Sequence, residues 1–202
     1  MPNTLGKTDI CNIALRRIGV RPINNVESDP DSAAVEMKAQ WANAVLNVLR
    51  EAEWNFAKKI QPLALLADEQ ILGWRFLYRY PADCAMFWKV ESPVSSYVHE
   101  FEHKWEAMIS PETNTPVIAT NVEGAYGRYT AQVEDVTRWD SNFVDCLAWR
   151  LAYEAAPRLS SDSQQLQACA QGYFRALSHA KTMNRVEQKN DHEQFGFFIN
   201  VR

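Results

Sequence analysis

The sequence predicts an α+β fold in which an antiparallel four-helix bundle, built from two N-terminal and two C-terminal helices, carries an inserted β-rich lobe and an extended C-terminal tail. Apolar residues recur at helical spacing near both ends of the 202-residue chain. Between these ends, prolines divide the sequence into short runs typical of strands. We therefore expect a helical part made of residues 1–54 and 138–188, an inserted β-rich lobe at 55–137 and a docking tail at 189–202.

Four segments have the periodicity and the end signals of amphipathic helices. The expected ranges are Thr8–Ile18, Asp31–Glu53, Asp140–Pro157 and Ser160–Gln188. The expected N-caps are Thr8 and Asp140 (or Ser141), and the second helix should start near Asp31 or Ser32. Gly19 is a stop signal after the first helix, and Pro157 should end or kink the third.

Each of these helices has an apolar stripe that needs a partner. In the second helix the stripe consists of Met37, Trp41, Ala44, Val45, Val48, Leu49 and Ala52. Glu36 and other polar residues occupy its remaining faces. In the last helix the stripe passes through Cys169, Tyr173 and Met183 (or Asn184) and ends at Val186. Because no helix can bury such a stripe alone, the antiparallel bundle is the economical arrangement.

The middle of the chain has the pattern of a β-rich lobe. Short runs with β-branched and aromatic residues are separated by proline and glycine. The expected strands are Asn55–Ile60, Phe76–Tyr80, Ala85–Val90, Val98–Ile109, Val117–Thr120 and Tyr126–Val133.

Composition argues against a nucleic-acid grip. The chain has 21 basic and 25 acidic residues, a net charge of −4, and no basic block. The Gly19–Pro22 segment between the first two helices does not fit a helix-turn-helix, because the loop is about twelve residues long and the second helix has no Arg or Lys cluster. No apolar run has signal-peptide or membrane-span length, so we expect a soluble protein made in the cytoplasm, without a membrane partner.

The residues also give little reason to expect an enzyme or a cofactor. Glycine clusters for phosphate binding and the nucleophile motif G-x-S-x-G are absent from the sequence. The four cysteines are far apart and lie within apolar stripes or beside turns, so we expect them to pack in the core. They are Cys11, Cys84, Cys146 and Cys169.

One motif suggests a metalloprotease. His99-Glu100-x-x-His103 matches H-E-x-x-H, in which both histidines bind zinc from one face of a helix and the glutamate acts beside the zinc-bound water. Here, however, residues alternate with period two from Tyr97 to Trp105. In a strand, residues four apart stand roughly 13 Å apart, too far to share one metal. We therefore predict a half-exposed strand without a zinc site; a helical 98–109 would reverse this prediction.

An ordered series of short motifs resembles a known family. The motifs are Ala14-Leu-Arg-Arg-Ile-Gly19 with Pro22-Ile23 and Asn25-Val-Glu27, Trp54-Asn-Phe56-Ala57, Leu77-Tyr-Arg-Tyr-Pro-Ala-Asp-Cys84, Tyr126-x-x-Tyr129-Thr-x-x-Val133-Glu-Asp135, and Phe143 with Leu147-Ala-x-x-Leu-Ala152. Together they cover about residues 8–185 and are similar to the head-to-tail adaptor (tail tubular protein A) family of short-tailed bacteriophages. No single motif is specific, and the order of the set carries the resemblance.

The resemblance implies a structural protein of the virion neck. Members of that family form a ring, typically dodecameric, between the portal protein and the tail nozzle or the next neck protein, and DNA passes through the lumen without sequence-specific binding. A weakly acidic wall suits such a conduit, because it does not hold a polyanion. Another neck or tail-completion protein is the alternative within the same class.

The C-terminal tail is the expected partner-binding segment. A polar spacer leads to an apolar end whose candidate anchors are Phe195, Phe197, Phe198, Ile199 and Val201. Chain ends are usually polar, so an aromatic end needs a place to dock. Two arrangements remain open: a strand that returns to its own lobe, or an arm that binds the portal or a neighbouring subunit.

Overall fold

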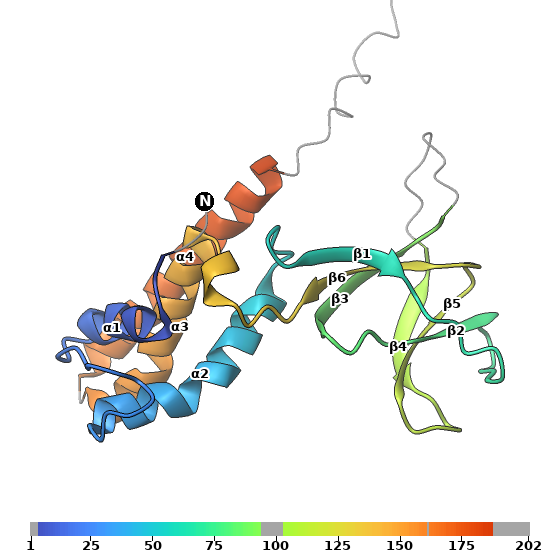
Figure 1. Cartoon of the computed structure of the whole chain (residues 1–202). Helices are drawn as coiled ribbons and strands as arrows, with labels where there is room; N and C mark the ends of the chain where they lie inside the picture. Colours follow the sequence, from blue (N-terminus) through green and yellow to red (C-terminus); the bar gives the residue numbers. More distant parts are fainter. Residues whose placement is uncertain (1–3, 94–102, 161, 188–202) are drawn as a thin grey trace, which may run out of the picture.

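The computed structural model describes residues 4–93, 103–160 and 162–187 (Figure 1). The helices are α1 Lys7–Arg17, α2 Ser32–Glu51, α3 Ser141–Leu159 and α4 Ser163–Glu187, with a short 3₁₀ turn, η1, at Val136–Arg138. The strands are β1 Lys58–Pro62, β2 Phe76–Arg79, β3 Cys84–Glu91, β4 Trp105–Ile109, β5 Pro116–Thr120 and β6 Tyr126–Ala131. Helices therefore form both ends of the described chain, and strands fill its middle.

The predicted antiparallel four-helix bundle is wrong. The central helix α3 packs against each of the other three, and α1 lies across α3 instead of alongside it (Figure 1). The physical reason is that α3 buries far more than one stripe of its surface. Its buried residues are Phe143, Val144, Cys146, Leu147, Ala148, Leu151, Ala152, Ala155 and Ala156. A helix that is apolar around most of its circumference lies inside a helical cluster, whereas each helix of a bundle buries only one face.

The helix ends show which end signals act locally. Asp31 caps α2 by accepting a hydrogen bond from the Ala33 backbone N at 2.9 Å, and Asp140 caps α3 by accepting one from Phe143 N at 2.7 Å, as predicted. The predicted cap Thr8 is wrong: α1 begins at Lys7, and the Thr8 hydroxyl accepts a hydrogen bond from Val26 N at 3.2 Å.

Three further positions in the helices differ from expectation or resolve an open choice. Pro157 lies within the last turn of α3, which continues to Leu159. Glu36, expected on a polar face, is buried; its carboxylate accepts from Gln40 Nε2 at 3.0 Å and lies 3.3 Å from Arg158 Nη1. In α4 the buried stripe ends on Asn184, whereas Met183 and Val186 are exposed, so the predicted end of the stripe at Val186 is wrong.

The strands form two three-stranded antiparallel sheets, with strand orders β1-β6-β3 and β2-β5-β4. In the first sheet Tyr129 of β6 pairs with Lys59 and Phe87; in the second, Ile118 of β5 pairs with Tyr78 and Ala107. All six predicted strands have a counterpart. The strand expected at 98–109 is described only from Trp105, because residues 94–102 lie outside the described chain.

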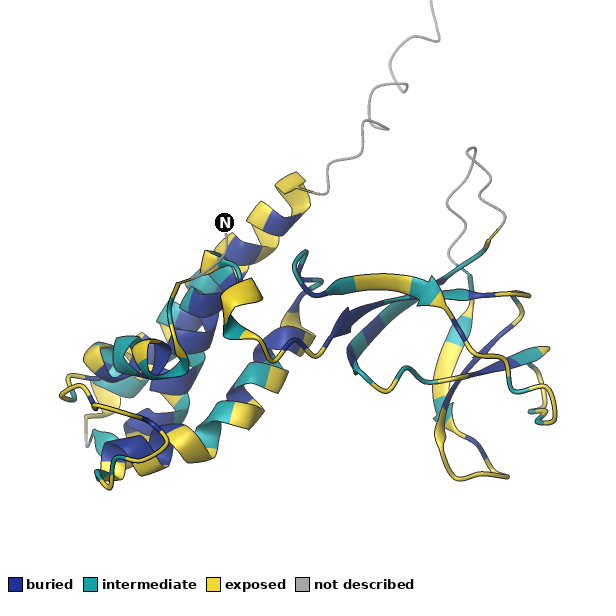
Figure 2. Ribbon diagram, in the orientation of Figure 1, coloured by how far each residue is buried: buried dark blue, intermediate teal, exposed yellow. Residues whose placement is uncertain are grey.

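Two main apolar cores hold these layers. The helical core includes the fully buried Trp54, Trp139 and Phe143. The second core lies between the sheets, where the rings of Phe87 and Trp105 meet edge to face at 4.8 Å. Figure 2 shows buried residues along the facing sides of the helices and exposed residues on the edge strands β1 and β4. The Trp54 segment, directly after α2, leads the chain from the first core into β1.

Candidate functional site

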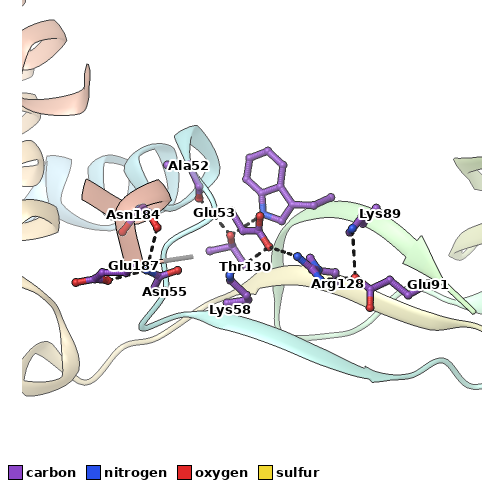
Figure 3. A network of polar contacts seen from close by, with 11 residues as sticks. Ala52, Glu53, Asn55, Lys58, Lys89, Glu91, Arg128, Thr130, Asn184 and Glu187 are labelled. Carbon is purple, nitrogen blue, oxygen red and sulfur yellow. Dashed lines mark hydrogen bonds and ion pairs between the residues drawn. The ribbon is translucent and has the colours of Figure 1, made fainter. Parts of the chain in front are cut away.

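The junction between the helices and the β1-β6-β3 sheet carries an extended charged network (Figure 3). The Glu53 carboxylate lies 3.8 Å from Lys58 Nζ and 3.7 Å from Arg128 Nη1. Arg128 Nη2 contacts the Glu91 carboxylate at 2.5 Å, and Lys89 Nζ lies 3.5 Å from the same oxygen. Because these side chains are about a quarter exposed, the network contributes modestly to stability and mainly fixes how the sheet meets the helices.

Further hydrogen bonds tie the end of α2 to the sheet beside that network. The Trp88 indole Nε1 donates to Thr130 Oγ1 at 2.8 Å, and Thr130 Oγ1 donates to the Ala52 carbonyl at 3.3 Å. Arg50 donates from Nη1 to the Ala85 carbonyl at 3.0 Å. Carbonyls at a helix C-terminus have no partner within the helix, so the Thr130 contact satisfies one carbonyl just beyond that end.

The last turn of α4 is fastened to the same junction. Asn55 donates from Nδ2 to the Glu187 carboxylate at 2.7 Å and to the Asn184 carbonyl at 3.4 Å. Segments from near the end of α2, from β3 and from the end of α4 therefore meet at one place, although they are far apart in the sequence.

A cleft of about 310 Å³ opens where these segments meet. Its walls include Glu51 and Glu53 at the end of α2, Trp88 of β3, and Lys181, Asn184 and Arg185 of α4. This volume is at the lower end of the range of ligand pockets. We call this space the junction cleft.

In the junction cleft, unpaired hydrogen-bond donors outnumber unpaired acceptors. Lys181 and Arg185, one turn apart and exposed, form no ion pair within the described residues, and neither does Glu51. Asn184 is only 7% exposed, and its Nδ2 has no hydrogen-bond partner in the described part of the chain. The arrangement suits a guest that brings a carboxylate or carbonyl oxygens together with an apolar group for the Trp88 ring.

A second, smaller cleft of about 220 Å³ lies between α1 and α3. Its charged residues are already paired, because the Arg17 guanidinium contacts the Asp145 carboxylate and donates to the Asp145 carbonyl at 3.0 Å. Arg17 also stacks over the Trp149 ring at 4.1 Å. This cleft is therefore part of the packing between the two helices, and Arg17 and Asp145 leave no unpaired charge in it for a ligand.

The predicted tail anchors, Phe195, Phe197, Phe198, Ile199 and Val201, lie outside the described residues. So do His99 and Glu100 of the H-E-x-x-H motif, whereas His103 is half-buried just before β4. Within the described ranges, no group of three or more His, Cys, Asp or Glu side chains is arranged to hold a metal ion.

The four cysteines are buried and free, which confirms their predicted place in the core. Burial raises the pKa of Cys11 and of Cys146 to about 12 each. Since the nucleophilic form of cysteine is the thiolate, neither group is activated at neutral pH.

The sequence predictions missed the residues of the junction cleft. Asn184 gave the clearest signal, as a polar residue near the end of an apolar stripe, flanked by Lys181 and Arg185.

Comparison with protein-family models gives no match, and none of the curated proteins compared with the chain is significantly similar to it. In the described part of the chain, no helix combines the length and apolarity that a membrane span requires.

Proposed function

We propose that this protein is a structural head-to-tail adaptor of a phage virion. In this proposal identical copies form a ring, typically dodecameric, that joins the portal protein to the tail nozzle or the next neck protein and encloses the DNA channel. The observation that carries the proposal is the ordered set of motifs between residues 8 and 185 that resembles the adaptor family.

Contacts between motifs that are distant in sequence support this proposal. The hydroxyl of Tyr129 donates to the Asp83 carboxylate, 46 residues earlier in the chain, at 2.9 Å. These residues belong to two of the motifs quoted for the resemblance. Motif residues that contact one another stabilise the fold. This is the role expected of motifs in a family of structural proteins.

A second meeting of motifs lies in the helical core. The rings of Trp54 and Phe56 each meet the ring of Phe143 edge to face, with centroids 5.0 Å apart. The first two residues follow α2, and Phe143 opens α3, so the motifs on both sides of the β-rich segment close on each other. The resemblance therefore coincides with the packing that connects helices to sheets.

The strength of assembly would come from the number of subunits. A ring of identical copies facing a ring of portal subunits converts modest pairwise binding into high avidity. We propose that the tail residues Phe195, Phe197, Phe198, Ile199 and Val201 bind the portal or a neighbouring copy. Deleting residues 190–202 should leave particles without joined tails, and normally joined tails would contradict this role.

Electron microscopy of the protein mixed with the portal protein from the same phage genome tests the main proposal. We expect a second ring stacked coaxially on the portal, absent from portal alone. A portal ring that stays bare at saturating concentrations of the full chain would contradict the adaptor role. If the ring stacks instead on another neck protein, the protein is a different connector of the same class.

The H-E-x-x-H motif supplies the competing proposal, a zinc metalloprotease. Metal analysis of the purified full chain separates the two functions: stoichiometric zinc that is lost in a His99→Ala, His103→Ala variant would favour the protease. Full particle assembly by that variant, with less than stoichiometric zinc in the wild type, would leave the structural proposal standing. Retention on duplex DNA with a steep salt dependence would instead indicate a DNA-binding protein.

A further inference from the structure

The loop between Leu66 and Trp74 presents one leucine entirely to solvent. Leu72 is 101% exposed, more than any other large apolar residue in the described part of the chain. Gly73, which follows it, has a φ of +93°, a conformation that glycine adopts without strain, so the turn that points Leu72 outward depends on this glycine.

The loop is held firmly at its base, so the exposure of Leu72 is not the result of a loose end. Its neighbour Ile71 packs with Trp74 on the small core of Leu77, Val117 and Ala119. Trp74 N donates to the Ile71 carbonyl at 3.1 Å. The Ser110 hydroxyl donates to the Glu69 carboxylate, which ties that side chain to the end of β4. Asp68 keeps an exposed carboxylate that forms no ion pair within the described residues.

The junction cleft has the complementary chemistry. Lys181 and Arg185 offer unpaired cationic donors, and Trp88 offers an indole ring whose N–H is already used by Thr130. The loop can supply an unpaired carboxylate on Asp68 to these two cations and an apolar side chain on Leu72 to the indole ring. The two surfaces therefore match in both charge and polarity.

The loop cannot reach the cleft of its own chain. Figure 1 shows it beside β2 at the end of the sheets farthest from the helices, whereas the cleft lies where α2 and α4 meet the other sheet. We propose that the Asp68–Leu72 loop of one copy inserts into the junction cleft of a second copy of this chain. The inference deepens the proposed ring and depends on it for its biological setting.

This contact would join two different surfaces, so each copy would bind one neighbour through its loop and the other neighbour through its cleft. Such a heterologous contact repeats from copy to copy and closes into a ring where the rotation allows, instead of ending at a twofold dimer. The loop–cleft contact would thus join each adaptor subunit to the next one around the channel.

Cysteine cross-linking of the full chain tests the contact without requiring the portal. Gln70→Cys places a thiol in the loop and Glu51→Cys one at the cleft, while Asp68, Leu72, Lys181 and Arg185 stay intact. The native cysteines are buried and do not compete. With a short bismaleimide, the double variant should give a ladder of dimers, trimers and longer products. A matched Leu65→Cys, Glu51→Cys variant carries its thiol at another exposed leucine, just outside the loop. It should give far less product although the contact is intact, because this thiol does not enter the cleft.

Two additions make the outcome decisive. Adding Leu72→Asp to the cross-linking pair should remove the ladder. Adding Lys181→Glu with Arg185→Glu should also remove it, and a further Asp68→Lys substitution should bring it back by restoring opposite charges. A ladder equal to that of the Leu65 control, or one unchanged by Leu72→Asp, would overturn the contact. Rings on the portal built from Leu72→Asp subunits would also overturn it while leaving the adaptor proposal intact; a specific ladder in a protein that forms no ring would do the reverse.

Discussion

Replacing Gly172 with alanine should destabilise the protein, although alanine is the better helix former. Gly172 lies in α4 against α3, and a Cβ added there would stand 2.6 Å from Cε3 of Trp149 and 2.7 Å from two further ring atoms. Real Cβ atoms do not approach so closely, so the indole ring would have to move. The ring is not free to do so, because the Arg17 guanidinium stacks over it at 4.1 Å and is itself held by Asp145.

The magnitude follows from three opposing effects. Replacing glycine by alanine inside a helix gains about 1 kcal/mol. Overpacking a well-filled contact costs about 1–3 kcal/mol. Displacing the ring from Arg17 loses a further 0.5–1 kcal/mol, roughly, for a partly exposed cation–π contact. The two losses outweigh the gain, so the free energy of unfolding should fall by about 0.5–3 kcal/mol.

Urea denaturation followed by circular dichroism measures this loss. Trp149→Leu provides the matched background, since a smaller side chain removes the clash: there, Gly172→Ala should be neutral or stabilising. The difference between the two backgrounds is a coupling energy of at least about 1 kcal/mol. Equal effects of Gly172→Ala in both backgrounds, or a more stable Gly172→Ala single variant, would refute the packing of α3 on α4 described here.

Three other predictions concern the helical core. Burial raises the pKa of Asp140 in spite of its hydrogen bond from Phe143 N. The contribution of Asp140 to stability is therefore present below its unfolded pKa of about 3.9 and is lost as the pH rises through its folded pKa. Between pH 4 and pH 7, urea titrations should show Asp140→Asn gaining stability relative to the wild type, because asparagine has no charge to bury. Phe143→Ala removes a fully buried ring and should lower the free energy of unfolding by about 3–5 kcal/mol by the same method, with a loss below 1 kcal/mol contradicting the aromatic core. Cys11 and Cys146 should resist Ellman's reagent at pH 8 in the folded protein and react fully in guanidinium, whereas rapid native labelling would contradict their burial.

Local signals in the sequence located the elements well, and tertiary contacts explain the misses. The caps Asp31 and Asp140 were predictable because each carboxylate accepts from a backbone N–H two or three residues away. Thr8 also has a capping side chain, but its hydroxyl is taken by Val26 N, 18 residues further along the chain. Glu36 is buried because Arg158, from the far end of α3, neutralises it. No periodicity can signal a partner more than a hundred residues away.

The junction cleft was beyond sequence prediction for the same reason. Glu51, Trp88 and Lys181 each have an unremarkable local pattern: a helix end, a strand interior and a solvent-facing turn. They become one site only because β3 and α4 both close on the end of α2. Predicting the site would have required the pairing of the strands and the direction of α4, neither of which the helical stripes contain.

The arrangement of the helices was partly encoded in α3 itself. A helical stripe through Phe143, Cys146, Leu147 and Leu151 is typical of one face of a bundle helix. Yet Val144, Ala148 and Ala152, each next to a residue of that stripe, are also buried. Small alanines allow close approach from several sides, so a helix rich in them can accept three neighbours where a bundle helix accepts two. α1, with 11 residues, is also too short to span α4, with 25. Because α3 is surrounded, the faces that remain open belong to α2, α4 and the sheets, and the two surfaces proposed to join successive copies lie on these outer elements.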